Sequence, residues 1–300
     1  MKMKHILAAI GMGAGCFSIH ASSAWAAPSD WQIQADTQAI YGNYSGSIKR
    51  KSVAGAGVIV RADYLDAGGF SLGGNYTKLN FNNGSVLNQQ AFYASVRYNT
   101  YWDALPGPLT LKLDGHLINN NDATANTDNV QVIAPQLSFL NYAKTFYLDL
   151  GYAHSTYQNN LSVQQWTPTL GLGLNAGSDW VQMRGYFIKP SNQARAQNKK
   201  QTTALDVKWT HWLAPDAWLG LDKIQLSGLA GERIYAVDGD AAAVYNLADI
   251  QQGSIAVAAQ WRIAQHHQLM LSFGDERYLD NTINNTYDNR YAYIDVTSQW

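Results

Sequence analysis

The sequence predicts an all-β fold, a transmembrane antiparallel up-and-down β-barrel of about 14 strands. Apolar and polar residues alternate with a period of two along most of the chain, as they do on strands with two unlike faces. The alternating segments are long enough to cross a membrane when tilted. The connections between them alternate between short turns and longer polar loops, which is typical of barrels that span a bilayer.

A secretory signal occupies the start of the chain. Lys2 and Lys4 precede an apolar run, and Ala24-Trp25-Ala26 fits a cleavage site. The predicted organisation is a signal peptide over 1–26 and one barrel domain over 27–300. The only cysteine, Cys16, lies in the signal, so no disulfide or cysteine-based metal site is expected in the mature chain. A lipoprotein signal around Cys16 is the less favoured alternative.

The composition disfavours several other classes of protein. Charged residues make up 14% of the chain and the formal net charge is -1, so no nucleic-acid partner is expected, because such partners require a strongly basic surface. The aromatic content of 12% disfavours a disordered chain.

The strand pattern can be followed from one end of the mature chain to the other. Residues 109–117 alternate apolar and polar side chains, and residues 31–41, 146–152, 166–174 and 205–209 repeat the pattern. Neighbouring side chains on a strand point to opposite faces, so each segment predicts one apolar and one polar face. Only 241–249 also fits a helix, and it falls between strands. The predicted strands are 31–42, 52–64, 69–81, 88–102, 108–119, 129–140, 144–157, 162–175, 179–189, 202–213, 217–231, 251–264, 267–278 and 289–300.

The connections divide into two kinds. Those after even-numbered strands are short and lie at 65–68, 103–107, 141–143, 176–178 and 264–266. Those after odd-numbered strands are mostly longer and polar, with the clearest at 43–51, 120–128, 190–201, 232–250 and 279–288. An even number of strands places both termini on the short-turn side, which is periplasmic in such barrels. The longest loop, 232–250, either lies on the surface, which we favour, or folds into the barrel.

Aromatic residues on the apolar face gather near both ends of the strands, as expected at two membrane interfaces. A soluble β-sandwich would show the same alternation, but its strands are usually shorter. The aromatic residues are Trp31, Tyr64, Phe70, Trp102 and Phe146 toward the short turns, and Tyr41, Tyr76, Phe92, Tyr152, Trp166 and Phe187 toward the loops.

The last strand alternates Ala292, Ile294 and Val296 with polar residues and ends at Trp300. It resembles the terminal strand of Gram-negative outer-membrane β-barrel proteins of the porin-like kind, although Ser298 stands where an apolar residue is commoner. The resemblance implies an outer-membrane location, contact with outer-membrane lipid and lipopolysaccharide, and delivery by periplasmic chaperones and the barrel-assembly machinery. Trp300 would belong to the assembly signal. A monomer is expected.

The interior of a barrel widens with strand number, and about 14 strands approach the size that leaves an aqueous channel. Strand parity directs charged side chains of both signs inward, which predicts weak ion selectivity or, alternatively, a salt-bridge network that stabilises the wall. Inward tyrosines either stack against sugars or fill space; they are Tyr93, Tyr147, Tyr186, Tyr291 and Tyr293. Candidates for the narrowest zone of the lumen are Asp36, Asp114, Asp149, Arg184, Lys208 and Asp295.

The residues give little support to catalysis, and no cofactor or metal is expected. His154 and Ser155 are adjacent on a predicted strand, so their side chains point to opposite faces and cannot form a dyad. The leading hypothesis is an outer-membrane channel for passive diffusion of small hydrophilic solutes. The alternatives are a barrel for export of surface polymers or envelope assembly, and a closed barrel whose loops bind or adhere.

Overall fold

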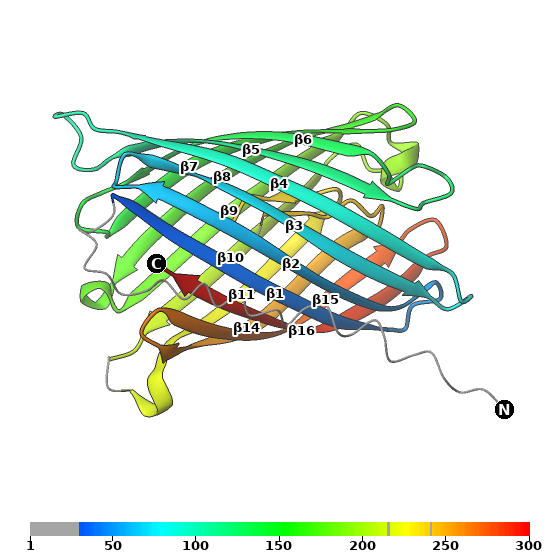
Figure 1. Cartoon of the computed structure of the whole chain (residues 1–300). Coiled ribbons are helices and arrows are strands. Elements are labelled where there is room, and N and C mark those ends of the chain that lie inside the picture. The colour runs from blue at the N-terminus through cyan, green and yellow to red at the C-terminus, as the bar shows by residue number, and fades with distance from the viewer. Residues whose placement is uncertain (1–29, 215–216, 241) are drawn as a thin grey trace. The chain divides into compact units, whose positions relative to one another are not determined.

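The computed structural model describes residues 30–214, 217–240 and 242–300. The predicted signal peptide lies outside the described residues. In the described chain, 14 long strands form one closed antiparallel barrel, and β1 lies beside β16 where the wall closes (Figure 1). The predicted fold is therefore confirmed, and each strand end lies within four residues of its predicted position.

The wall strands are β1 (Trp31–Ser45), β2 (Arg50–Tyr64), β3 (Gly68–Phe81), β4 (Val86–Thr100), β5 (Leu109–Asn120), β6 (Val130–Leu140), β7 (Phe146–Tyr157), β8 (Leu161–Leu174), β9 (Asp179–Pro190), β10 (Thr202–Trp212), β11 (Leu221–Arg233), β14 (Ile250–Ala264), β15 (His267–Asp280) and β16 (Asn285–Gln299). The short strands β12 (Val237–Asp238) and β13 (Ala243–Val244) form a separate hairpin. Single 3-10 turns lie at η1 (Asn175–Gly177), η2 (Ala194–Ala196) and η3 (Trp218–Gly220). None of these described helical turns is long and apolar enough to cross a membrane.

The chain ends close the wall. β1 and β16 pair over their length, with Ala39 opposite Ile294. The backbone of the last residue, Trp300, exchanges two hydrogen bonds with Ile33, of 2.9 and 3.1 Å between nitrogen and oxygen. A sheet edge left open in hydrocarbon would expose unpaired N–H and C=O groups, so these bonds matter for a wall that faces lipid.

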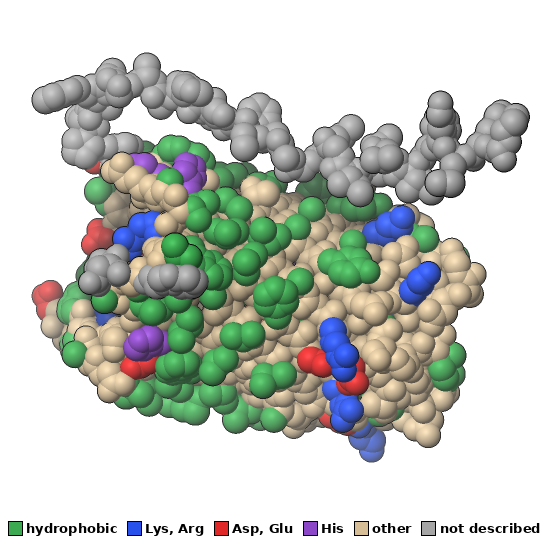
Figure 2. All heavy atoms as spheres, turned by 90° about the horizontal axis from the view of Figure 1, so that it is seen from below, with side chains coloured by type: hydrophobic (Ala, Val, Ile, Leu, Met, Phe, Trp, Pro, Cys, Tyr) green, Lys and Arg blue, Asp and Glu red, His purple; other side chains and the backbone are tan. Residues whose placement is uncertain are grey.

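The two faces of the wall differ as the alternation predicts. On β5, the outward Leu111 and Leu117 are 51% and 53% exposed, whereas the inward Asp114 and His116 are 2% and 4% exposed. On the outer face in Figure 2, hydrophobic side chains spread over the wall and charged side chains lie mainly toward its two ends. An apolar exterior around a polar interior fits a membrane-spanning barrel.

Two of the predicted long loops are short turns. The predicted loops 43–51 and 279–288 shrink to 46–49 and 281–284, because the ladders of β1–β2 and β15–β16 continue into polar sequence. Asn285 joins the two turns: its side-chain oxygen accepts a hydrogen bond from the backbone N–H of Ile48 (2.9 Å), and its side-chain nitrogen donates to the carbonyl of Gly46 (2.9 Å). Gly46 has a φ of 78°, which favours glycine at this turn.

The preference for a surface position of loop 232–250 is wrong. Between β11 and β14 the chain turns into the barrel, and residues Ile234, Tyr235, Ala236 and Val237 are at most 4% exposed. We call residues 234–249 the inward loop. The stretch 241–249 contains β13 rather than a helix in its described part.

The alternating connections predict which rim faces the outside of the cell. Cysteines introduced at Ala194 and Asn284, on the long-loop rim, should react with a membrane-impermeant thiol reagent on intact cells. A cysteine at Ala176, in the turn between β8 and β9, should react only after the cells are opened. The reverse labelling pattern would show that the termini do not face the periplasm.

Candidate functional site: the barrel lumen and the inward loop

The inward loop rests on an apolar part of the inner wall. Near the long-loop rim, the inner face of β5 to β9 carries aliphatic side chains that are at most 5% exposed; they are Ile118, Val130, Val132, Ala153, Leu161, Val163 and Ile188. Ile234 and Val237 pack against this group. Burying an aliphatic side chain of this size contributes roughly 1.5–3 kcal/mol, so the contact favours a docked loop.

One glutamine fixes the backbone of the inward loop to the wall. The side chain of Gln165 on β8 donates a hydrogen bond to the carbonyl of Val237 (2.6 Å) and accepts one from the backbone N–H of the same residue (2.9 Å). Gln165 is 2% exposed. It therefore satisfies two backbone groups that would otherwise be buried without partners at considerable cost.

The tip of the inward loop is acidic and faces basic residues of the wall. Arg184 on β9 lies 2.9 Å from Asp240 and 3.4 Å from Asp238, measured between side-chain nitrogen and oxygen. On the other side of the tip, the Lys112 ammonium donates to the carbonyl of Gly239 (3.2 Å). Burial raises the pKa of Asp240, but the Arg184 guanidinium lowers it below its usual value, so the carboxylate is ionised at neutral pH.

The far end of the inward loop is also held. The Asn246 side chain donates to Gln89 on β4 (2.7 Å) and to the carbonyl of Thr127 (3.1 Å). Asp249 forms an ion pair with Arg50 and accepts a hydrogen bond from the Tyr287 hydroxyl. The loop is thus fixed at its start and tip to β5 to β9, and at its end to β2, β4 and β16.

The docked loop divides the lumen into two cavities. The larger, of about 1200 Å³, reaches toward the short-turn rim, and the smaller, of about 290 Å³, lies toward the long loops. Seven residues line both cavities and mark where they approach each other. We call them the neck; they are Ile40, Asn75, Thr77, Ala242, Ala243, Tyr245 and Glu276.

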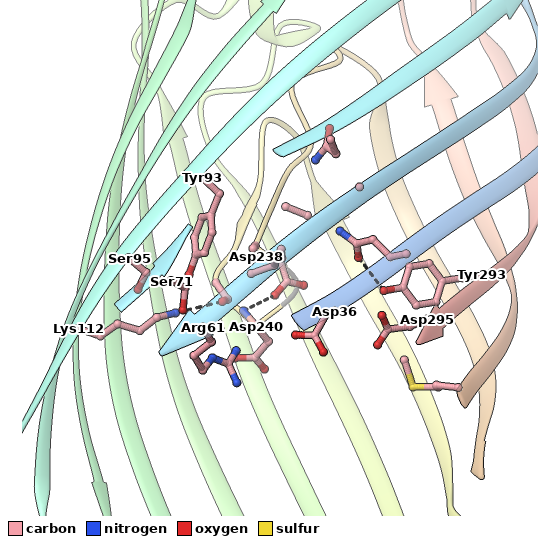
Figure 3. Close-up of a pocket in the computed structure, with 18 of the residues that line it drawn as sticks. Asp36, Arg61, Ser71, Tyr93, Ser95, Lys112, Asp238, Asp240, Tyr293 and Asp295 are labelled. Atoms are coloured by element: carbon pink, nitrogen blue, oxygen red, sulfur yellow. Dashed lines mark hydrogen bonds between the residues drawn. The ribbon is translucent and has the colours of Figure 1, made fainter. Parts of the chain in front are cut away.

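The predicted constriction residues fall into two groups. Asp36, Lys208 and Asp295 line the larger cavity, and Asp36 and Asp295 lie together near the seam of the wall (Figure 3). There the Thr297 hydroxyl contacts both carboxylates, at 2.8 Å from Asp36 and 3.4 Å from Asp295.

The other three predicted residues are nearly inaccessible. Asp114, Asp149 and Arg184 are 2%, 6% and 6% exposed. Asp114 pairs with Lys112 (2.8 Å), and Arg184 lies 3.8 Å from Asp149 beneath the acidic tip of the inward loop. Whether any of the six limits passage stays a prediction.

The lumen contains both an open charged surface and a network of ion pairs. Arg97 pairs with Asp63 at 2.7 Å, while Arg61 and Glu276 line the larger cavity without an ion-pair partner within 4 Å among the described residues. Ion pairs and charged side chains without an ion-pair partner thus occur in different parts of the same described wall, and weak ion selectivity stays a prediction.

The inward tyrosines are mostly bonded to the wall. Tyr93 donates to Asp114 (3.2 Å), Tyr147 to Asp149 (2.9 Å) and Tyr293 to Gln38 (2.7 Å). Together with Tyr291 they line the larger cavity, whereas Tyr186 is 1% exposed in the apolar contact under the inward loop. Tyr186 is therefore packed beneath the loop, and its hydroxyl donates to Asp238 (3.4 Å).

The seven neck residues are not among the predicted constriction candidates. Of the four on the wall, strand parity turns the charged Glu276 inward and the other three are uncharged; the remaining three belong to the inward loop, for which a surface position is expected from the sequence. The sequence did contain one indication of the surface on which the inward loop docks. On β6, Val130, Val132 and Ala134 occupy positions on the inner face, where other strands carry polar residues. An apolar inner face predicts that something apolar covers it.

The described parts of the chain offer no arrangement for metal binding. Among residues 30–214, 217–240 and 242–300, no group of three or more His, Cys, Asp or Glu side chains could hold a metal ion. Ser155 on β7 is 1% exposed on the inner face, and its neighbour His154 points to the other face.

A closed barrel of 14 strands with an apolar exterior and a polar, partly open interior defines the class of outer-membrane β-barrels with a channel-like lumen. No protein-family model matches the chain, and no curated protein matches it in sequence. Among solved structures, the chain is similar to the toluene transporter TodX of Pseudomonas putida, with a TM-score of 0.55 and 8% identity over 91% of this chain and 90% of that chain.

Two further solved structures have lower similarity. The outer membrane protein Omp33 of Acinetobacter baumannii matches with a TM-score of 0.48 and 7% identity over 90% of this chain and 99% of that chain. The COG4313 outer membrane channel from Pseudomonas putida F1 matches with a TM-score of 0.45 and 11% identity over 92% and 97% of the two chains. At such identities the likeness to TodX shows the fold alone.

The two hydrogen bonds of Gln165 predict that this residue holds the inward loop in place. Gln165→Leu leaves the N–H and C=O of Val237 unpaired and should weaken docking by about 1–3 kcal/mol. Hydrogen–deuterium exchange of peptides from 234–247 should then be faster, while exchange of β8 and β9 is unchanged. Gln136→Leu, at an inward position with no hydrogen bond to the described part of the loop, is the control. Equal protection in both variants would contradict the assignment.

Proposed function

We propose that this protein is an outer-membrane channel through which small hydrophilic solutes pass by passive diffusion. The observation that carries the proposal is the cavity of about 1200 Å³ inside the closed wall, lined by uncharged polar side chains and by charges of both signs. An interior of this polarity retains water, and water-filled barrels conduct solutes. The proposal includes a monomeric barrel with both termini in the periplasm, and no catalytic role.

The neck would set the size limit of the channel. On the wall side it is lined by β1, β3 and β15, and on the other side by the inward loop. Tyr245 is the largest side chain that the loop contributes, and its ring lies against the Arg233 guanidinium at 4.3 Å. Burial raises the pKa of the Tyr245 hydroxyl to about 12, so the side chain stays neutral at physiological pH.

Weak ion selectivity fits the charges of this route. The larger cavity holds the acidic Asp36, Asp295 and Glu276, and also the basic Arg61 and Lys208. A strong filter requires a ring of one sign at the narrowest point, and Glu276 is the only acidic or basic residue among the seven described neck residues.

A closed barrel whose long loops bind a partner is the second candidate. The observation in its favour is the firm docking of the inward loop, whose residues 234–237 are at most 4% exposed. A loop held at its start, tip and end could keep the lumen shut. Export of surface polymers finds no specific support in the described residues.

Single-channel conductance separates the two candidates. The purified, refolded chain should give steady conductance with weak ion selectivity in a planar bilayer, and a variant lacking residues 236–248 should conduct more. Silence from the parent with conductance from the variant would make the inward loop a plug and favour the closed barrel. Silence from both, with the barrel shown to be folded, would refute the channel.

Tyr245 offers a finer test of the neck. Tyr245→Ala removes the aromatic ring from the narrow zone and should raise single-channel conductance roughly twofold, because pore diameter limits the passage of ions. Tyr98→Ala, which removes an outward-facing ring that is 60% exposed, is the matched control. If both variants conduct like the parent, the limiting constriction lies elsewhere.

A further inference from the structure

The smaller cavity, between the neck and the long loops, has the size and lining of a separate site. Its volume of about 290 Å³ lies near the lower end of the range for small-molecule sites, about 300–1,000 Å³. Its lining comes from the inward loop, from the inner faces of β2, β5 and β15, and from neighbouring strands. A solute that passed between the long loops and the neck would have to cross it.

The acidic and basic side chains around this cavity are equal in number. Arg50 is paired directly with Asp249. Arg233 donates through its Nε atom to the side-chain oxygen of Gln251, whose nitrogen donates in turn to Glu276 (3.3 Å). Two positive and two negative residues therefore line the space, and none is left as a single unbalanced charge. An ion moving in from water would lose hydration without finding a countercharge in excess.

Polar hydrogen-bonding capacity nevertheless remains. His116 lines the cavity and is 4% exposed, and its Nε2 atom has no hydrogen-bond partner among the described residues. The ring is held in place by Tyr93, whose centroid lies 5.0 Å away. Buried polar side-chain atoms nearly always have a partner, so the unpaired Nε2 atom marks unused hydrogen-bonding capacity in the wall of this cavity.

The Arg233 side chain is held rigidly at the same cavity. Its guanidinium lies 4.3 Å from the centroid of Tyr245 and 5.3 Å from that of Tyr186, and the residue is 6% exposed. Stacking between rings fixes the plane in which the group donates. Val53 and Ile118 add apolar surface to the lining.

From these contacts we propose that the smaller cavity is a binding site for a neutral, hydroxyl-rich solute of about monosaccharide size. Hydroxyl groups both donate and accept, so they match a lining that offers the Arg233 and His116 nitrogens together with carboxylate and amide oxygens. The carbon skeleton of such a solute fits the apolar part of the lining. The proposal rests on the proposed channel function and names the solute class that the route above the neck favours.

Current block by glucose tests the site in the channel itself. Glucose added on the long-loop side should interrupt the single-channel current of the parent in a saturable way, with a dissociation constant in the millimolar range. Sodium acetate and glycine, as an anion and a zwitterion of small size, should not block at equal concentration. Block by either of these with glucose inactive, or no saturable block by glucose, would overturn the proposal.

Substitutions of His116 locate the site. His116→Phe removes the nitrogen and fills part of the cavity, and should weaken glucose block at least about tenfold, as expected for the loss of a hydrogen bond and of space. His116→Gln keeps a donor and an acceptor and should recover part of the affinity. His267→Phe makes the same change at the short-turn rim, where His267 contacts Ser298 (2.9 Å) outside both cavities, and should leave block unchanged.

Failure of the channel and failure of the site give different results. If the folded parent does not conduct, equilibrium dialysis of labelled glucose against the detergent-solubilised chain still measures binding. Saturable binding that His116→Phe weakens would support the site in a closed barrel. Conductance without glucose block, or equal block in parent and His116→Phe, would refute the site while the channel stands. If His116→Phe does not fold, the comparison of block by glucose, sodium acetate and glycine on the parent channel decides whether the proposed site exists.

Discussion

The structure depends on one constraint: a sheet surrounded by hydrocarbon cannot leave backbone N–H and C=O groups unpaired. The hydrogen bonds between Ile33 and Trp300 meet it at the seam, where the first and last wall strands join. Closure of the wall then sets the size of the interior, because 14 strands enclose more space than inward side chains fill. The inward loop occupies part of that space, and the cavities on either side of it are what the wall and the loop leave open.

The same rule governs the inward loop once it enters the barrel. Its backbone polar groups lose bulk water, and the Gln165 side chain replaces that water at Val237 while Lys112 does so at Gly239. The apolar segment 234–237 finds an apolar surface, and the acidic tip finds Arg184. The start and the tip of the loop are matched by complementary parts of β5 to β10, and its end is held by β2, β4 and β16. The neck lies between the loop and strands β1, β3 and β15.

The wall could be predicted from the sequence because its signal is local. Strands such as β5 and β7 show their two faces in the order of their own residues, and the alternation of connections gives their direction. The predicted strand ends are too early where polar residues continue the hydrogen-bonded pairing beyond the apolar segment. Asn43, Tyr44 and Ser45 do so on β1. Polarity there marks exposure to water and not the end of pairing.

The lumen could be predicted only in part, because its arrangement depends on contacts across the barrel. Parity correctly turns Asp36, Arg184 and Asp295 inward, but it cannot tell that the inward loop covers Arg184 and leaves the other two beside the larger cavity. The docking of residues 234–237 joins segments more than 70 positions apart, such as Gln165 and Val237. The sequence does show apolar residues at inner positions of β6, where Val130 and Val132 stand in place of the polar residues expected there. Apolar residues at inner positions of a barrel strand thus predict which part of the wall a loop will cover, and the uncovered part predicts where a solute can pass.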